Sequence, residues 1–209
     1  MQIEAKKVNE VDLIKEASRH YNEKTAIVAD KNAFFDVANP SAFFAGMYRY
    51  CSSQQYGMRI PRYLSDRLGS LTPTSSRDSI GDYVSDISGA KIEFKTTFKS
   101  AANSTYNVVQ VRLYEPLDLF FVCAIDPSDS FKYNLFLLNK NEMAYEVNRE
   151  GSSAHIPNKM QKVNMYREYR MTLSPKTFKR WQSNYSYETL TDVYNAIANF
   201  KRFYVKING

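Results

Sequence analysis

Two carboxylates and a lysine in the middle of the sequence have the types and the spacing that could hold a metal ion. Asp82 follows a glycine, and Glu93 and Lys95 lie two residues apart in a stretch that alternates between polar and apolar residues. Ser88-Gly89 between them is suited to a two-residue hairpin turn, since glycine tolerates positive φ. That turn would pair Val84 with Glu93 and Asp82 with Lys95, so we expect the three side chains on one face of the hairpin.

Such a cluster is suited to the hydrolysis of a phosphodiester bond. Mg²⁺ binds through a few carboxylate oxygens and keeps several waters and a substrate phosphate oxygen in its octahedral shell. We therefore expect Asp82 and Glu93 to be metal ligands, with Mn²⁺ able to replace Mg²⁺. A bound metal lowers the pKa of its water. The ammonium group of Lys95 would position that water and offset the negative charge that develops on the phosphate.

The same residues also have a simpler interpretation. Asp, Glu and Lys are common on solvated strands, and opposite charges across a hairpin stabilise it modestly. Asp86 is a second candidate on the same face, but in the register given above it lies opposite Lys91 next to the turn, which is more typical of an exposed ion pair. The spacing by itself is therefore a hypothesis of a metal site that its structural context must support.

The elements that would position these residues are predicted from periodicity and turn residues. Helices are predicted over 8–21, from about 41 to 51, and over 61–68, 139–150 and 187–203. Strands are predicted over 80–87, 90–98, 107–113, 117–125 and 131–138, and loops over 70–78 and 151–158. The continuous apolar run 117–125 is typical of a central strand that is covered on both faces. This order predicts a single α/β (α+β) domain over residues 1–209, with a central mixed β-sheet flanked by helices.

The composition favours an acidic partner and a reducing compartment. Lys and Arg number 28 against 22 Asp and Glu, and the net charge of +6 suits nucleic acid. The two cysteines, Cys51 and Cys123, lie far apart in the sequence without a CxxC or Cys/His cluster, which argues against a zinc site. The first ten residues lack an apolar signal sequence, and the longest apolar run is too short to cross a bilayer. We therefore expect a soluble cytoplasmic protein.

Four short pieces of sequence between residues 52 and about 140 form a further pattern. They are the helix opening at 53–60, Gly81-Asp82, Ile92-Glu93-Phe94-Lys95, and Gln110-Val111-Arg112 leading into the apolar strand 117–125. Together they resemble the PD-(D/E)XK nuclease superfamily, and within it the type II restriction endonucleases. The resemblance implies a restriction-endonuclease-like fold and Mg²⁺-dependent cleavage of double-stranded DNA, usually by a homodimer at a short palindrome. It also implies a prokaryotic cytoplasmic enzyme with a cognate DNA methyltransferase in the same host.

Two positions depart from the pattern of that superfamily. Gly81, rather than proline, precedes the aspartate of the motif. Related enzymes often carry an acidic residue on the helix before the Gly-Asp strand, and the corresponding position here is Pro61. A carboxylate that would support a second metal is therefore absent from that position, or its role passes to Asp66.

Residues that could contact DNA lie mostly after the hairpin. Glutamine can bind adenine through two hydrogen bonds, and arginine can bind guanine or a phosphate in the same way. The stretch 159–187 interleaves basic and aromatic residues, so we expect DNA-recognition elements in the C-terminal part, about 140–187. Surface solvation, an ion pair, or a basic face over an aromatic core that includes Trp181 would explain the same residues. The candidate DNA-binding residues are Gln110, Arg112, Arg59, His155, Lys159 and Lys162.

A type II restriction endonuclease is the function that these observations favour, and two alternatives remain open. A DNA repair or junction-resolving nuclease of the same fold would prefer mismatched or branched DNA over an intact duplex. A non-catalytic DNA-binding module would bind DNA equally well after mutation of Asp82. An HNH-type or zinc-dependent nuclease is disfavoured, because the chain has only two histidines, His20 and His155.

Overall fold

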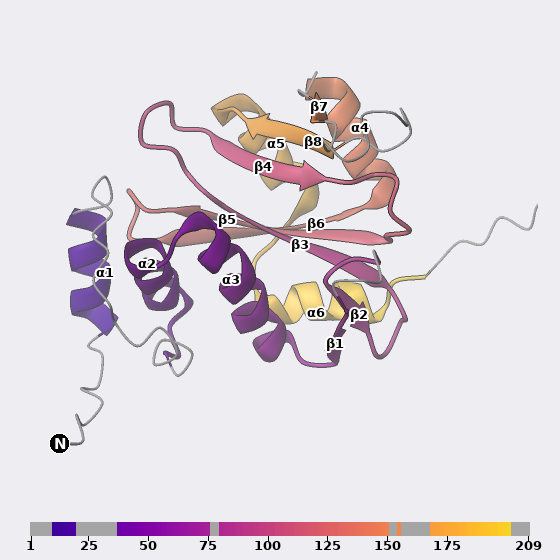
Figure 1. The fold of residues 1–209 in the computed structure, drawn as a ribbon, viewed down its shortest axis with the longest axis horizontal. Coiled ribbons are helices and arrows are strands. Elements are labelled where there is room, and N and C mark those ends of the chain that lie inside the picture. The colour runs from indigo at the N-terminus through magenta and orange to yellow at the C-terminus, as the bar shows by residue number, and fades with distance from the viewer. Residues whose placement is uncertain (1–9, 20–36, 76–79, 151–153, 156–167, 202–209) are drawn as a thin grey trace, which may run out of the picture.

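The computed structural model describes residues 10–19, 37–75, 80–150, 154–155 and 168–201. Within these ranges the chain forms three layers around a central six-stranded sheet (Figure 1). One face of the sheet is covered by α2, α3 and α6, with α1 packed against α2, and the other by α4, α5 and a three-stranded sheet. The helices are α1 (Glu10–Arg19), α2 (Pro40–Tyr50), α3 (Ser53–Leu68), α4 (Lys140–Glu150), α5 (Pro175–Tyr185) and α6 (Leu190–Ala198).

The central sheet has the strand order β1-β2-β3-β5-β6-β9 and is mostly antiparallel. Its one parallel pair in the described chain is β3 with β5. The small sheet has the order β4-β8-β7, with antiparallel pairs. The strands are β1 (Leu71–Pro73), β2 (Tyr83–Ser85), β3 (Lys91–Phe98), β4 (Tyr106–Val111), β5 (Leu119–Asp126), β6 (Lys132–Asn139), β7 (Ala154–His155), β8 (Glu168–Leu173) and β9 (Ser186–Tyr187). The predicted mixed α/β architecture, a central mixed sheet flanked by helices, is confirmed.

Strand β5 lies in the middle of the molecule and is buried from Leu119 to Ile125. Phe121 and Cys123 point into the core against the helices, whereas Phe120 and Val122 point toward α4, α5 and the small sheet. Because both faces are covered, every position from Leu119 to Ile125 is apolar, as the continuous hydrophobic run predicted. Among the described residues, no helix is both long enough and apolar enough to span a membrane.

The β2–β3 hairpin has a register that differs from the predicted one by two residues. Tyr83 pairs with Ile92 and Val84 with Lys91, so the register places Asp82 opposite Glu93. A shift of two residues leaves every side chain on its original face, whereas a shift of one would move it to the other. The predicted pairing was wrong, but the candidate residues still share one face.

The turn of this hairpin is longer than the predicted Ser88-Gly89. The hydroxyl of Ser85 accepts hydrogen bonds from the backbone N–H groups of Ile87 and Ser88, which favours a four-residue turn over residues 86–89. Asp86 therefore lies in the turn, and its carboxylate accepts a hydrogen bond from the hydroxyl of Thr72 at 2.7 Å. The predicted position of Asp86 opposite Lys91 was wrong, since Val84 occupies it.

Helix α3 is longer than the predicted segment 61–68, and Pro61 lies inside it rather than in its first turn. The helix begins at a capping box, in which the hydroxyl of Ser52 accepts from the backbone of Gln55 and the side chain of Gln55 accepts from the backbone of Ser52. It ends at Gly69, which has φ 68°. The capping residues were present in the sequence, but the helix was predicted to begin at Pro61 because proline is common in the first turn of a helix.

Further elements lie in segments for which none was predicted. Strands β1 and β7 fall in the expected loops 70–78 and 151–158, and β8 and α5 fall in the basic and aromatic stretch 159–187. Trp181 is fully buried on α5, which confirms that it packs in the core. Glu146 on α4 accepts hydrogen bonds from the indole of Trp181 and the hydroxyl of Tyr185, each at 3.0 Å, and pairs with Arg180. Arg180 and Tyr185 therefore join α5 to α4.

Candidate active site

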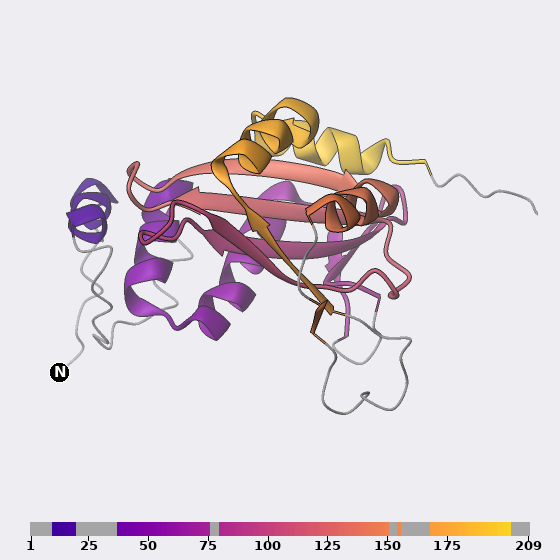
Figure 2. The same cartoon turned by 90° about the horizontal axis from the view of Figure 1, so that it is seen from above.

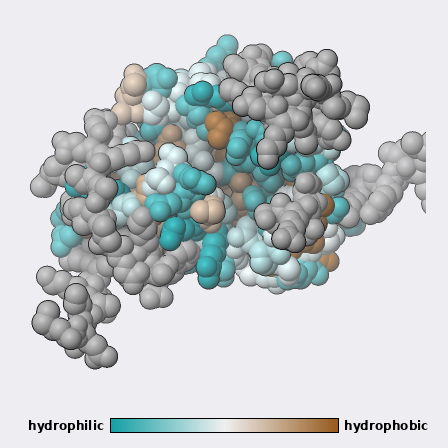
Figure 3. Space-filling model, viewed as in Figure 1, coloured by the Kyte–Doolittle hydropathy of each residue, from teal (hydrophilic) through white to brown (hydrophobic). Residues whose placement is uncertain are grey.

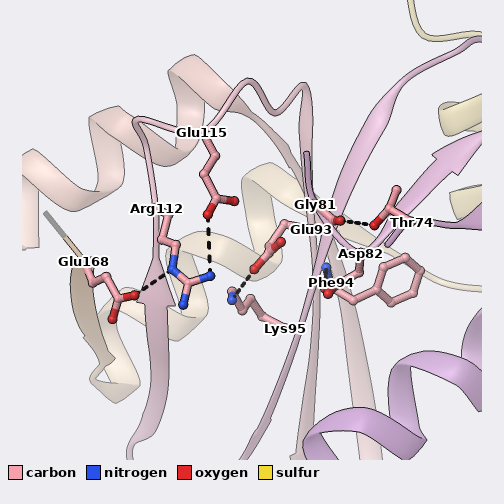
Figure 4. Close-up of polar contacts among 9 residues, drawn as sticks. All are labelled: Thr74, Gly81, Asp82, Glu93, Phe94, Lys95, Arg112, Glu115 and Glu168. Carbon is pink, nitrogen blue, oxygen red and sulfur yellow. Dashed lines mark hydrogen bonds and ion pairs between the residues drawn. The ribbon is translucent and has the colours of Figure 1, made fainter. Parts of the chain in front are cut away.

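Asp82, Glu93 and Lys95 lie together beside the central sheet (Figure 4). Glu93 and Lys95 come from β3, and Lys95 Nζ lies 2.5 Å from Glu93 Oε1. Asp82 precedes β2, and its Oδ2 accepts a hydrogen bond from the backbone N–H of Phe94 at 2.9 Å. This bond turns the Asp82 carboxylate toward β3. The structure thus brings together the three side chains that the sequence singled out.

Gly81 allows Asp82 to approach β3 closely. It has φ 93°, and a Cβ atom at this position would lie 2.7 Å from both the carbonyl oxygen of Ile92 and the Leu117 side chain. Asp82 donates its backbone N–H to the Ile92 carbonyl at 2.9 Å and accepts from the backbone of Thr74 at 2.9 Å. The Thr74 hydroxyl donates to the Gly81 carbonyl. These contacts require a glycine before the aspartate.

The Asp82 carboxyl group has a pKa raised to about 6. The main cause is the loss of hydration where the group lies against the strand, and the second is the nearby charge of Glu93. The hydrogen bond from Phe94 and the charge of Lys95 offset part of this rise. The residue as a whole is exposed, whereas Glu93 is buried. A ligand in solvent can therefore reach Asp82, and a cation there would relieve the repulsion between the two carboxylates.

Glu115 is a third carboxylate at this site, and sequence reasoning missed it. It is buried, and its pKa is raised by burial and then by Glu93, with Arg112 and Lys95 acting in the opposite direction. Its backbone carbonyl accepts a hydrogen bond from Lys140 Nζ at 2.6 Å. Glu115 lies just before β5, and because β5 is parallel to β3, residues before each strand lie at the same edge of the sheet. The local sequence does not specify this parallel pairing, so it gave no signal for Glu115.

Arg112 was predicted either to contact DNA or to form an ion pair, and the structure shows ion pairs. Its Nε lies 2.6 Å from Glu168 Oε1, and its Nη1 lies 3.5 Å from Glu115 Oε1 (Figure 4). Gln110 is exposed and has φ 55°, at the point where the pairing of β4 with β8 shifts between Val108 and Val111.

The remaining candidate DNA-binding residues that the structure describes are Arg59 and His155. Arg59 is half-buried on α3, and its Nε is buried without a hydrogen-bond partner in the described structure. His155 lies on β7, opposite Glu168 of β8. Lys159 and Lys162 lie outside the described residues. On α3, Pro61 is buried and Asp66 is exposed.

The donor set suits a metal ion that keeps most of its water. The described residues contain no group of three or more His, Cys, Asp or Glu side chains arranged to hold a metal ion. Mg²⁺ is often held by one or two carboxylates, with waters and phosphate oxygens completing its shell. Asp82 and Glu93 supply such a pair, and the raised pKa of Asp82 fits a site that a cation would stabilise. The residues therefore fit a phosphate-bound Mg²⁺ better than a closed structural metal site.

No protein-family model matches the chain, and no curated protein matches it in sequence. The functional conclusion therefore rests on the residues and their geometry.

Proposed function

We propose that this protein is a type II restriction endonuclease, which cleaves double-stranded DNA by Mg²⁺-dependent hydrolysis of phosphodiester bonds. The observation that carries the proposal is the placement of Asp82, an exposed residue, beside the buried Glu93, with Lys95 Nζ 2.5 Å from Glu93. When the acids are ionised, the four carboxylates exceed the two cationic groups by two negative charges, which a divalent cation would balance. The carboxylates are Asp82, Glu93, Glu115 and Glu168, and the cationic side chains are Lys95 and Arg112.

Each of the three motif residues has a separate chemical role in this proposal. Asp82 and Glu93 would hold the Mg²⁺ ion, which when bound supplies a Lewis acid and a water of lowered pKa. The backbone N–H of Phe94 orients the Asp82 carboxylate, and Lys95 fixes one oxygen of Glu93. The Lys95 ammonium also has donors to orient the attacking water and to stabilise negative charge on the phosphate.

The surrounding fold supports a restriction-endonuclease-like arrangement. The two motif strands β2 and β3 pair inside a mixed sheet, and α3 packs against β3 on the face opposite the site. One active site cuts one strand, so a double-strand cut at a palindrome calls for a homodimer with matching two-fold symmetry. The host of such an enzyme would need a methyltransferase that protects its own recognition sites. The net charge of +6 supports DNA as the partner.

The test is cleavage of a defined DNA duplex by the wild-type protein and by Glu93→Ala. We expect Mg²⁺-dependent cleavage by the wild type and a rate lower by roughly 10³-fold in the variant, because a ligand of the metal is lost. Asp86→Ala is the matched control, since Asp86 belongs to the same hairpin but lies in its turn. It should cleave like the wild type. Unchanged cleavage by a folded Glu93→Ala would refute the proposal.

A further inference from the structure

Arg112 lies directly after β4, between the small sheet and the candidate active site (Figure 4). The close-up shows its guanidinium group beside the Glu93–Lys95 pair, with Glu168 on its other side. The side chain is 32% exposed, so solvent and a ligand can reach it. Its positive charge lowers the pKa of both Asp82 and Glu115, which shows that it acts on the same carboxylates as Lys95 does.

Two carboxylates fix the guanidinium group and leave part of it available. Nε contacts Glu168 at 2.6 Å and Nη1 contacts Glu115 at 3.5 Å. A guanidinium carries five N–H donors in one plane. Among the described residues these two carboxylates are the hydrogen-bond acceptors of the Arg112 side chain, so the donors of Nη2 remain for a ligand. A rigid planar donor with free N–H groups next to metal-binding carboxylates matches the oxygens of a phosphate.

We propose that Arg112 binds the phosphate group of the DNA at which Asp82, Glu93 and Lys95 act, and that Glu168 and Glu115 are positioning residues that aim its guanidinium group. The inference rests on the proposed nuclease function and deepens it, because it names a phosphate contact within the same site. Glu168 belongs to β8 and Glu115 precedes β5, so the two carboxylates hold Arg112 from both sheets. The small sheet thereby sets the position of a group that binds the substrate.

Two variants separate the charge of Arg112 from the shape of its side chain. Arg112→Ala removes a phosphate contact, so the slope of log K for DNA binding against log salt should become shallower by about 0.9, measured with Ca²⁺ in place of Mg²⁺. Arg112→Lys keeps the charge and loses the planar fork. We expect its salt slope to stay at the wild-type value while kcat for cleavage falls by roughly 10²-fold. Glu168→Gln keeps Arg112 but weakens the contact that positions its guanidinium group. This variant should lower kcat by about 10-fold and leave the salt slope of DNA binding unchanged.

The Lys99–Asp126 ion pair provides a matched control. Lys99 Nζ lies 2.6 Å from Asp126 Oδ2, and the two side chains are 29% and 14% exposed. Arg112 and Glu168 are closely matched, with a distance of 2.6 Å and exposures of 32% and 16%. Lys99 directly follows β3, four residues beyond Lys95, and outside the candidate active site. Lys99→Ala should leave both kcat and the salt slope unchanged. Melting temperatures of all variants would identify any change that comes from loss of folding.

The outcomes distinguish this inference from the proposed function. A wild-type protein that binds DNA without cutting it overturns the nuclease proposal, and the salt slope of Arg112→Ala then still decides the phosphate contact. If the wild type cleaves DNA but folded Arg112→Ala keeps the wild-type slope and Arg112→Lys keeps the wild-type kcat, Arg112 is a structural ion pair and the inference is wrong. A wild type that binds no DNA overturns both.

Discussion

Asp82 is the proposed metal ligand whose pKa is shifted, so its protonation should be linked to metal binding. Its pKa of about 6 in the folded protein lies above the ordinary value of 3.8. The folded state therefore holds this proton more tightly than the unfolded chain does, and ionisation of Asp82 lowers stability as the pH rises from about 4 through about 6. Above about pH 6 Asp82 is ionised, and the metal-free protein has lost the whole of this contribution to its folding stability. A divalent cation favours the ionised carboxylate, so it competes with the proton.

From this competition we predict that the affinity for Mg²⁺ falls about tenfold per pH unit below about pH 6. Asp82→Asn should raise the melting temperature of the metal-free protein near neutral pH by about 2 °C, because the amide oxygen still accepts from Phe94 while the charge is gone. Calorimetric titration at several pH values and thermal melts with and without Mg²⁺ measure both effects. A pH-independent affinity, or Mg²⁺ stabilisation that survives in Asp82→Asn, would contradict this assignment.

The motif residues could be found from the sequence, whereas their neighbours could not. Alternating residues of one strand share a face, so the spacing of Glu93 and Lys95 was enough to place them together. The contact between Arg112 and Glu168 joins positions 56 residues apart in the sequence. A local pattern carries no signal of such a contact. Glu115 was missed for the same reason, since its place beside Glu93 depends on the parallel pairing of β3 with β5.

At the scale of elements, the hairpin shows which errors a sequence-based prediction tolerates. The predicted turn was two residues too short. The three candidate side chains still share one face of the hairpin, because side chains along a strand alternate with a period of two residues. Strands β3, β5 and β6 were predicted within two residues at each end, since each has a strong apolar pattern. β8 and α5 were missed because their charged and aromatic residues were interpreted as a surface for DNA rather than as elements with one buried face.

The close approach of Gly81 to β3 gives a prediction for this element. Gly81→Ala would force a Cβ atom against backbone at φ 93°, so we expect a loss of about 2 kcal/mol in the free energy of unfolding and strongly reduced cleavage, since Asp82 moves away from Glu93. Gly89→Ala is the control, because Gly89 also has positive φ, 69°, but nothing lies within 4 Å of its Cβ position. It should cost less stability and keep cleavage. Chemical denaturation and cleavage assays measure the two variants, and equal losses of cleavage would argue against the proposed role of Gly81.

At the scale of the whole molecule, the candidate site lies on the face of the central sheet that carries the small sheet. Figure 2 shows β8, α4 and α5 lying over this sheet when the molecule is seen from above. The exposed basic residues Arg170, Lys176 and Lys179 belong to β8 and α5, whereas Arg180 is used to join α5 to α4. Part of the C-terminal basic stretch is therefore on the surface, as the proposed contacts with phosphates require.

The described surface suits a polar partner. Figure 3 shows one face on which hydrophilic residues predominate and hydrophobic ones form small separate groups. The exposed large hydrophobic residues of the described chain are spread over several elements: Val11, Met58, Ile87, Val109 and Tyr145. Scattered apolar residues of this kind do not mark an interface by themselves. The net charge of +6 is consistent with the acidic partner of the proposed function.

The most direct test of the central claim is to incubate the purified protein with unmethylated DNA of phage length, with Mg²⁺ or with EDTA, and to sequence the ends of the fragments. The proposed function predicts discrete fragments that require Mg²⁺, share one short palindrome at their ends and are absent with Glu93→Ala. No cutting, or cutting restricted to branched or mismatched DNA, would contradict it.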